Sequence, residues 1–337
     1  MAFRCTYLTD DKIIQSKVET FIHEWNSLNK QFSIKTSGST GLPKEIKLEK
    51  KFAVKSALLT GEYFKFNNID SMLLCISPDT IGGTMIIVRA IVWKKHLIVV
   101  SPSRNPLKNL KEKIGFASFV PLQIQSILSE NPTALSQIDT ILIGGGPLNY
   151  SLKEKLNSIH SNSFESFGMT ETYSHIALRK CKKNTYLFDL LDGIDITKTN
   201  FTNQLIINSL ELGIQDLITN DIVSIPNKHQ FDWLGRIDFV INSGGIKFHP
   251  ELIERKLEHY FNHAYFIHKE TSKEYGEIII LILECENSKQ LSDTYLNDLK
   301  SILQRYEIPK KIYFINPFIR TESNKINRLE TYNSIFN

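Results

Sequence analysis

Short apolar runs alternate with segments of helical periodicity along the first half of the chain. The apolar runs are short enough to be buried strands, which we expect at 72–76, 97–101, 116–120 and 138–143. The helical periodicity predicts helices at 14–28, 50–66, 107–114, 122–129 and 151–160. The last of these helices opens with a capping-box pattern at Ser151 and Glu154. This alternation is typical of an α/β domain with a mostly parallel, buried sheet.

The last hundred residues follow a different order, typical of a small α+β module. A strand at 239–242 leads into a turn at Gly244 and Gly245. The remaining expected elements are a helix at 250–261, strands at 264–268 and 277–284, a helix at 292–306 and a strand at 311–316. A chain of 337 residues exceeds what one hydrophobic core usually holds. We therefore expect an N-terminal domain at 1–237 and a C-terminal domain at 238–337.

Composition argues against several classes of protein. The 40 basic and 36 acidic residues leave a net charge of +4, too small to indicate a nucleic-acid partner. Charged residues interrupt the apolar stretch 85–100, so we expect no membrane span. The first residues lack the apolar core of a signal peptide. The four scattered cysteines form no CxxC pair, which favours a reducing compartment and a cytoplasmic protein. We expect a monomer or a homodimer.

A loop rich in hydroxyl groups and glycines follows the strand-like segment 31–35. Its residues are Thr36, Ser37, Gly38, Ser39, Thr40, Gly41, Leu42, Pro43 and Lys44. Backbone N–H groups, hydroxyls and one ammonium on such a loop can bind a polyphosphate. The loop is not a P-loop of the NTPase type, because Pro43 precedes the lysine and Glu45 follows it. A polar surface loop with ordinary turns is the alternative.

Four further motifs follow in order. The glycines and proline of 144–148 end a strand and can approach a flat ring through the backbone. The segment 167–172 offers an aromatic ring, a hydroxyl and a carboxylate. Asp221 can accept two hydrogen bonds from a ribose diol. Near the end of the chain, the segment 320–328 places Lys325 between two arginines.

The order and spacing of these motifs over residues 31–328 resemble those of the adenylate-forming enzymes. This superfamily comprises acyl-CoA synthetases, carrier-protein adenylation domains and luciferases. The resemblance implies that a carboxylate attacks the α-phosphate of ATP to give an acyl-adenylate and pyrophosphate, and that a thiol such as CoA then displaces AMP. It also implies that the C-terminal domain rotates about a hinge at Asp238 between the two steps.

The resemblance assigns roles to individual residues. Phe167 would stack on adenine, Thr170 would contact the α-phosphate, Glu171 would help to hold Mg²⁺, and Lys325 would reach the reacting phosphate. The implied ATP-binding residues are Thr36, Ser37, Gly38, Ser39, Thr40, Gly41, Lys44, Gly144, Gly145, Gly146, Pro147, Phe167, Gly168, Met169, Asp221 and Arg236. The implied residues beside the CoA tunnel are Ser243, Gly244 and Gly245. Taken singly, Phe167 could be core, Glu171 a helix-start charge, Asp221 a turn residue and Lys325 a solvated charge.

One branch of the superfamily shares further local features with this chain. Only 35 residues precede the phosphate loop, and a shortened N-terminal part is similar to that of o-succinylbenzoate–CoA ligases of menaquinone biosynthesis. Arg89 stands in an otherwise apolar helical segment, where a buried charge needs a partner. The second carboxylate of o-succinylbenzoate would supply one; a helix end or an acidic side chain is the alternative. The implied acyl-pocket residues are Thr80, Gly83, Arg89, Ser174 and His175.

The sequence departs from the family's motifs at two places, and two alternatives to an o-succinylbenzoate–CoA ligase stay open. Asn324 replaces the customary glycine before the last lysine, and the segment 77–83 lacks the usual aromatic or histidine gate of the acyl pocket. The chain could instead be another aryl- or acyl-CoA ligase, or an enzyme that loads a carrier protein. A non-catalytic nucleotide-binding module is the alternative from a different class.

Overall fold

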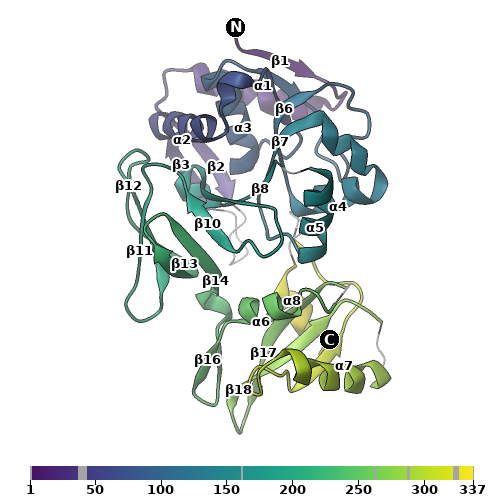
Figure 1. The fold of residues 1–337 in the computed structure, drawn as a ribbon. Coiled ribbons are helices and arrows are strands. Elements are labelled where there is room, and N and C mark those ends of the chain that lie inside the picture. The colour runs from purple at the N-terminus through teal and green to yellow at the C-terminus, as the bar shows by residue number, and fades with distance from the viewer. Residues whose placement is uncertain are drawn as a thin grey trace. The chain divides into compact units, whose positions relative to one another are not determined.

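The computed structural model describes residues 2–36, 44–160, 162–261, 263–286, 289–321 and 326–336 (Figure 1). The chain forms two compact units. The first comprises Met1–Ile196, Ile207–Leu217 and Asn227–Phe231, and the second comprises Thr197–Ile206, Ile218–Pro226 and Asp232–Asn337. The division between the units passes within four strands. These are β11 (Asp195–Lys198), β12 (Gln204–Ser209), β13 (Ile214–Asn227) and β14 (Gln230–Arg236).

The first unit is built on a sheet with the strand order β1-β5-β4-β6-β7-β8-β9-β10. Its strands are β1 (Arg4–Tyr7), β4 (Ser71–Leu74), β5 (His96–Val99), β6 (Ile114–Phe119), β7 (Ile138–Ile143), β8 (Ser163–Met169), β9 (Ser174–Lys180) and β10 (Leu187–Leu190). All pairs from β1 to β8 are parallel, and β8, β9 and β10 are antiparallel to one another in turn. The strands β4 and β6 are buried at every residue, as expected of parallel strands covered on both faces. The expected α/β fold is confirmed.

Four helices of the first unit match the ranges expected from periodicity, and α3 lies outside those ranges. The helices are α1 (Lys12–Asn26), α2 (Lys50–Tyr63), α3 (Ile81–Val92), α4 (Pro121–Glu130) and α5 (Tyr150–Ile159), with 3₁₀ turns at Phe66–Asn68, Pro132–Gln137 and Thr170–Thr172. The expected helix at 107–114 is wrong. Leu107 and Leu110 are both buried, but a single turn closed by the Leu110 N–H to Leu107 carbonyl bond satisfies that spacing, and Ile114 already begins β6.

Two local details also differ from the expectations. The helix α5 is capped by Asn149, whose side chain accepts a hydrogen bond from Leu152 N, so the cap precedes the Ser151 pattern. The segment Lys44–Glu49 is a strand, β3, which pairs antiparallel with β2 (Gln31–Thr36). Its alternating residues fit a strand with one face covered.

The C-terminal part of the second unit contains a five-stranded sheet. Its strands are β15 (Ile241–Ser243), β16 (Ile246–Phe248), β17 (Tyr265–Ser272), β18 (Gly276–Leu283) and β19 (Lys311–Phe314), and its helices are α6 (Pro250–Leu257), α7 (Lys289–Ile302) and α8 (Arg328–Asn333). A core that includes Ile253, Leu257, Leu281 and Leu299 joins helices to sheet. The expected strand at 239–242 starts later, because Ile237–Phe239 forms a 3₁₀ turn.

Candidate functional site

The two ends of the expected phosphate loop lie side by side in the first unit. Thr36 ends β2 and Lys44 begins β3, and the two residues are paired across the hairpin. Six other predicted site residues lie outside the described part of the chain: Ser37, Gly38, Ser39, Thr40, Gly41 and Lys325. The β2–β3 ladder therefore fixes the backbone positions of Thr36 and Lys44.

The glycine segment 144–147 continues from the carboxyl end of β7. Ser166 Oγ donates a hydrogen bond to Ile143 O at 3.0 Å, which ties this end of β7 to β8. A Cβ on Gly144 would lie 2.8 Å from Ser166 Oγ, so the backbone passes close to its neighbour. Gly145 has φ +83°, a left-handed conformation that favours glycine. The segment thus presents backbone rather than side chains.

The segment 167–172 forms a tight connection from β8 to β9. The half-buried ring of Phe167 packs edge-on against Phe231, with ring centroids 5.0 Å apart. Gly168 allows the close approach of the two strands, since a Cβ there would lie 1.9 Å from Ser174 O. Thr172 Oγ1 accepts from Met169 N at 2.9 Å and lies 2.7 Å from Ser174 O.

Two of the predicted catalytic residues lie on this connection and differ in their exposure to solvent. Thr170 is buried and the adjacent Glu171 is exposed at the start of the 3₁₀ turn. Tyr173 and Ser174, which follow, have φ +55° and +102°. The buried hydroxyl of Thr172 holds this turn together. Thr172 belongs to the motif 167–172, but its place in the sequence indicates no role for its side chain.

Arg89 lies on α3 with only 1% of its surface exposed. Its Nη2 is 3.4 Å from His175 Nδ1, and its Nε is buried without a hydrogen-bond partner. Among the described residues, no carboxylate forms an ion pair with Arg89. Burial lowers the pKa of the guanidinium to about 9, which leaves it charged at neutral pH.

The hydrogen bonds around His175 determine its tautomer. Thr60 Oγ1 donates its single proton to Ser56 O at 2.9 Å, so it accepts from His175 Nε2, which is 3.2 Å away. The Nδ1 atom then carries a lone pair that faces the Arg89 guanidinium. Burial, followed by the charge of Arg89, lowers the pKa of His175 well below its ordinary value. The ring is therefore neutral. No sequence pattern indicates that Thr60 contacts His175, because the two residues are 115 positions apart.

The other predicted acyl-pocket residues have local packing roles. Thr80 caps α3, with its Oγ1 accepting from Gly83 N at 3.2 Å. A Cβ on Gly83 would lie 2.1 Å from Ser77 O, so the start of the helix requires glycine. Ser174 Oγ is 3.4 Å from His175 Nδ1. Contact of these residues with an acid stays a prediction.

The predicted ribose-binding and hinge residues lie in the second unit. Asp221 is a buried strand residue of β13 rather than a turn residue, and its Oδ1 accepts from Trp233 Nε1 at 2.8 Å. Burial raises the pKa of Asp221. Arg236 Nη2 is 2.7 Å from Asp238 Oδ2, and Asn220 Nδ2 also donates to Asp238. No pattern in the sequence points to Trp233, because it lies 12 positions from Asp221 and meets it only across the folded strands.

The predicted CoA-tunnel residues form the turn between β15 and β16. Ser243 ends β15, and Gly244 and Gly245 follow with φ +58° and +82°. A Cβ on Gly245 would meet no atom within 4 Å. The turn therefore leaves space beside its backbone.

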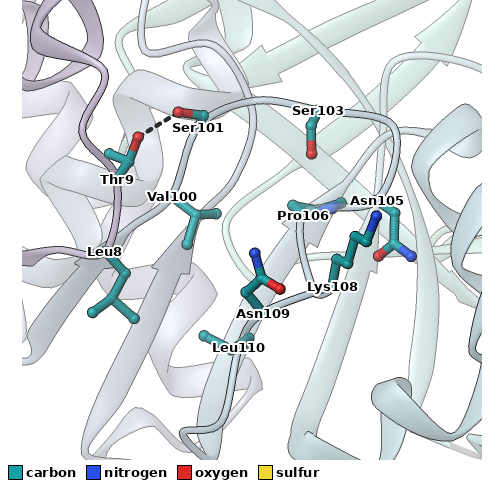
Figure 2. A pocket seen from close by; sticks show the side chains of 10 residues that line it. All are labelled: Leu8, Thr9, Val100, Ser101, Ser103, Asn105, Pro106, Lys108, Asn109 and Leu110. Carbon is teal, nitrogen blue, oxygen red and sulfur yellow. Dashed lines mark hydrogen bonds between the residues drawn. The ribbon is translucent and has the colours of Figure 1, made fainter.

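A cavity of about 240 Å³ lies elsewhere in the first unit, after the ends of β1 and β5 (Figure 2). Its lining includes Thr9, Ser101, Ser103, Lys108 and Asn109 and none of the predicted site residues. Within the described residues there is no cluster of three or more His, Cys, Asp or Glu suited to a metal ion. Over the same part of the chain, no helix is long and apolar enough to span a membrane.

The chain is similar in sequence and in fold to known proteins. A family profile described as AMP-binding enzyme matches residues 31–191. A solved structure of an acyl-CoA synthetase (AMP-forming)/AMP-acid ligase II-like protein from Dyadobacter fermentans is 30% identical, covers 96% of this chain and 95% of that chain, and has a TM-score of 0.63. The 2-succinylbenzoate–CoA ligase of Haemophilus influenzae is 26% identical over 87% of this chain and 68% of its own length.

A second relative and a second structure agree with these matches. The 2-succinylbenzoate–CoA ligase of Bacillus subtilis is 25% identical over 87% of this chain and 66% of its own length. The chain therefore spans about two thirds of the length of these curated relatives. The o-succinylbenzoate CoA synthetase of Bacillus subtilis was solved with ATP and magnesium ion. It matches 89% of this chain and 69% of that chain, with a TM-score of 0.75 and 20% identity. This chain therefore shares its fold.

Proposed function

Because this chain belongs to the family of AMP-binding enzymes, we propose that it activates a carboxylic acid with ATP and passes the acyl group to CoA. The acid that we propose is o-succinylbenzoate, and the product is o-succinylbenzoyl-CoA for menaquinone biosynthesis. Relatives that carry the name 2-succinylbenzoate–CoA ligase support this choice.

The buried guanidinium of Arg89 is the observation that carries the substrate assignment. A buried charge is costly unless an opposite charge and hydrogen bonds compensate it. Among the described side chains, Arg89 bonds to neutral His175, and its Nε lacks a partner. o-Succinylbenzoate has two carboxylates. One is activated by ATP, and the other would supply the negative charge that the Arg89 site lacks.

The proposed first step needs positive charge around the phosphates of ATP. An oxygen of the acid attacks the α-phosphorus, and the bond to pyrophosphate breaks. The exposed carboxylate of Glu171 fits Mg²⁺, which binds one or two carboxylates together with phosphate oxygens. When bound, Mg²⁺ would neutralise phosphate charge. The loop from Thr36 to Lys44 would hold the β- and γ-phosphates, and Lys325 would stabilise charge in the transition state.

The proposed second step uses the hinge and the glycine turn. The C-terminal domain, 238–337, would rotate about Asp238 and withdraw Lys325. The turn at Ser243, Gly244 and Gly245 would then lie beside the pantetheine arm. The thiol of CoA attacks the acyl carbon, and the bond to AMP breaks. Both a cytoplasmic location and a monomeric or dimeric state stay predictions; all four cysteines are free thiols, which agrees with a reducing compartment.

Pyrophosphate release with a panel of acids tests this proposal. The purified protein is given ATP and Mg²⁺ with o-succinylbenzoate, benzoate or a fatty acid, and products formed after addition of CoA are identified by mass. We expect release with o-succinylbenzoate and the corresponding CoA thioester. Release with another acid alone would overturn the substrate. Adenylate that does not react with CoA would favour a carrier-protein acceptor. No release with any acid would contradict the enzyme activity.

A further inference from the structure

Three buried charged side chains meet behind the glycine segment of the first unit. Glu165 on β8 accepts a hydrogen bond from Arg179 Nε at 2.7 Å, and Lys153 Nζ on α5 is 3.0 Å from the same Oε2 atom. The three side chains are 5%, 8% and 9% exposed, respectively. Arg179 lies directly opposite Glu165 in the β8–β9 ladder. We refer to Glu165, Lys153 and Arg179 as the β8 charge cluster.

A buried cluster of this kind is weak evidence for a gain in the stability of the fold. A buried ion pair often contributes no more stability than apolar side chains of the same volume would, because removing charges from water is costly. Burial raises the pKa of Glu165, but the charges of Arg179 and Lys153 outweigh it, so the pKa is lowered overall and the carboxylate is ionised. Its contacts lead towards two parts of the proposed adenine site.

The first contact reaches the glycine segment. Leu148 N donates to Glu165 Oε1 at 3.0 Å, and Leu148 directly follows Pro147. Pro147 has no N–H group, so the N–H group of Leu148 is the first backbone donor after Gly146. Its bond to Glu165 anchors the end of the glycine segment. A buried carboxylate is a stronger acceptor for this N–H than a neutral group.

The second contact reaches the aromatic side of the site. Arg179 Nη1 donates to Tyr186 O at 3.1 Å, and its guanidinium carbon lies 4.3 Å from the centroid of the Phe188 ring. The Phe188 and Phe167 centroids are 5.7 Å apart. Because Glu165 orients Arg179, it also supports the ring against which Phe167 packs.

We infer that Glu165 is a positioning residue that holds both sides of the adenine site, the glycine segment through Leu148 and Phe167 through Arg179 and Phe188. This inference rests on the proposed function. Glu165 itself does not contact the nucleotide; it sets the spacing between the backbone of 144–147 and the ring of Phe167. Its loss should therefore weaken binding of the adenosine part and spare the phosphates.

Binding of AMP and of inorganic tripolyphosphate, measured by calorimetry in the presence of Mg²⁺, tests this inference. The Glu165→Gln variant keeps an acceptor for Leu148 but loses the charge that orients Arg179. We expect its Kd for AMP to rise about tenfold, and its Kd for tripolyphosphate to change less than about twofold. Glu154→Gln is the matched control, because Glu154 lies on the neighbouring α5 and pairs with exposed Lys183 instead. Its AMP affinity should equal that of the unmodified protein.

The possible outcomes separate the inference from the proposed function. If Glu165→Gln lost affinity equally for AMP and for tripolyphosphate, or bound AMP as the unmodified protein does, the inference would be overturned. The proposed function would stand in either case. An unmodified protein that does not bind AMP would overturn the proposed function and the inference together. If Glu165→Gln does not fold, the double variant Glu165→Gln and Lys153→Met restores the net charge of the cluster. The double variant should show the same selective loss of AMP affinity. Unchanged AMP affinity in the double variant would overturn the inference.

Discussion

At the scale of single residues, Arg89 requires a negatively charged partner, and the described residues supply none. Its guanidinium is buried and charged, and its described partner is a neutral imidazole. Arg89→Ala is expected to lower kcat/KM for o-succinylbenzoate about a hundredfold, because a buried charge-assisted contact is lost. Turnover of a monoacid such as benzoate should be unaffected. Activity measured with both acids checks this, and equal losses would contradict a selective role.

Thr60 is expected to act on the same site through His175. Its hydroxyl oxygen accepts a hydrogen bond from the Nε2–H group of His175, which keeps the Nδ1 lone pair directed at Arg89. Thr60→Val removes the acceptor, so the favoured tautomer is lost and KM for o-succinylbenzoate should rise about tenfold, an effect of the size of one hydrogen bond. Thr60→Ser keeps the hydroxyl and is the matched control. If Thr60→Ser and Thr60→Val behaved alike, the tautomer argument would be wrong.

At the scale of elements, the β8–β9 connection depends on one glycine. Gly168→Ala would place a Cβ 1.9 Å from Ser174 O, a backbone atom that cannot move without opening the ladder. We expect a loss of about 2–4 kcal/mol in the free energy of unfolding. Gly146→Ala is the control, since its nearest atom, Pro121 Cγ, would be 3.8 Å away. Denaturant titration of both variants checks the prediction, and equal stabilities would refute it.

Local periodicity predicted the central parallel strands and most of the helices, but not the strands β8 to β14. The buried strands β4 to β7 and the helices α1, α2, α4 and α5 follow directly from apolar spacing. The segment 107–114 shows the limit, because two buried leucines three positions apart fit one turn as well as a helix. The strand β3 was missed because its partner β2 lies across the phosphate loop, and pairing of this kind depends on contacts beyond the local pattern.

At the scale of whole units, a buried carboxylate couples stability to pH. Burial raises the pKa of Glu251 in the second unit to about 7, and the charge of Arg328 opposes this only in part. The folded chain therefore keeps a proton that the unfolded chain releases above about pH 4.5. The resulting stabilisation is complete below that pH and is lost as the pH rises towards 7.

Glu251→Gln should remove this dependence on pH. Relative to the unmodified protein, the variant is expected to gain up to about 3 kcal/mol in stability between pH 5 and pH 8, since one pKa unit corresponds to about 1.4 kcal/mol. Thermal unfolding of both proteins across this range checks the prediction. A stability difference that does not change with pH would show that Glu251 is already ionised at pH 5.

Movement of the C-terminal domain between the two reaction steps gives a further prediction. Lys325 is proposed to act in adenylate formation and to withdraw before CoA attacks. Lys325→Ala should therefore lower adenylate formation at least about a hundredfold, because a charge at the reacting phosphate is lost. Release of AMP from a synthetic acyl-adenylate by CoA should remain within about threefold. Unchanged adenylate formation would exclude the catalytic assignment of Lys325.

The sequence by itself determined the family motifs, the mostly parallel sheet and the unusual position of Arg89. These follow from short-range features, namely the order of motif residues, the spacing of apolar side chains and one charge in an apolar segment. Only the tertiary structure decided which groups those residues meet. His175 lies 86 positions from Arg89, and Arg179 and Lys153 lie on different elements from Glu165. The partner of a buried charge depends on long-range packing, which a local pattern does not specify.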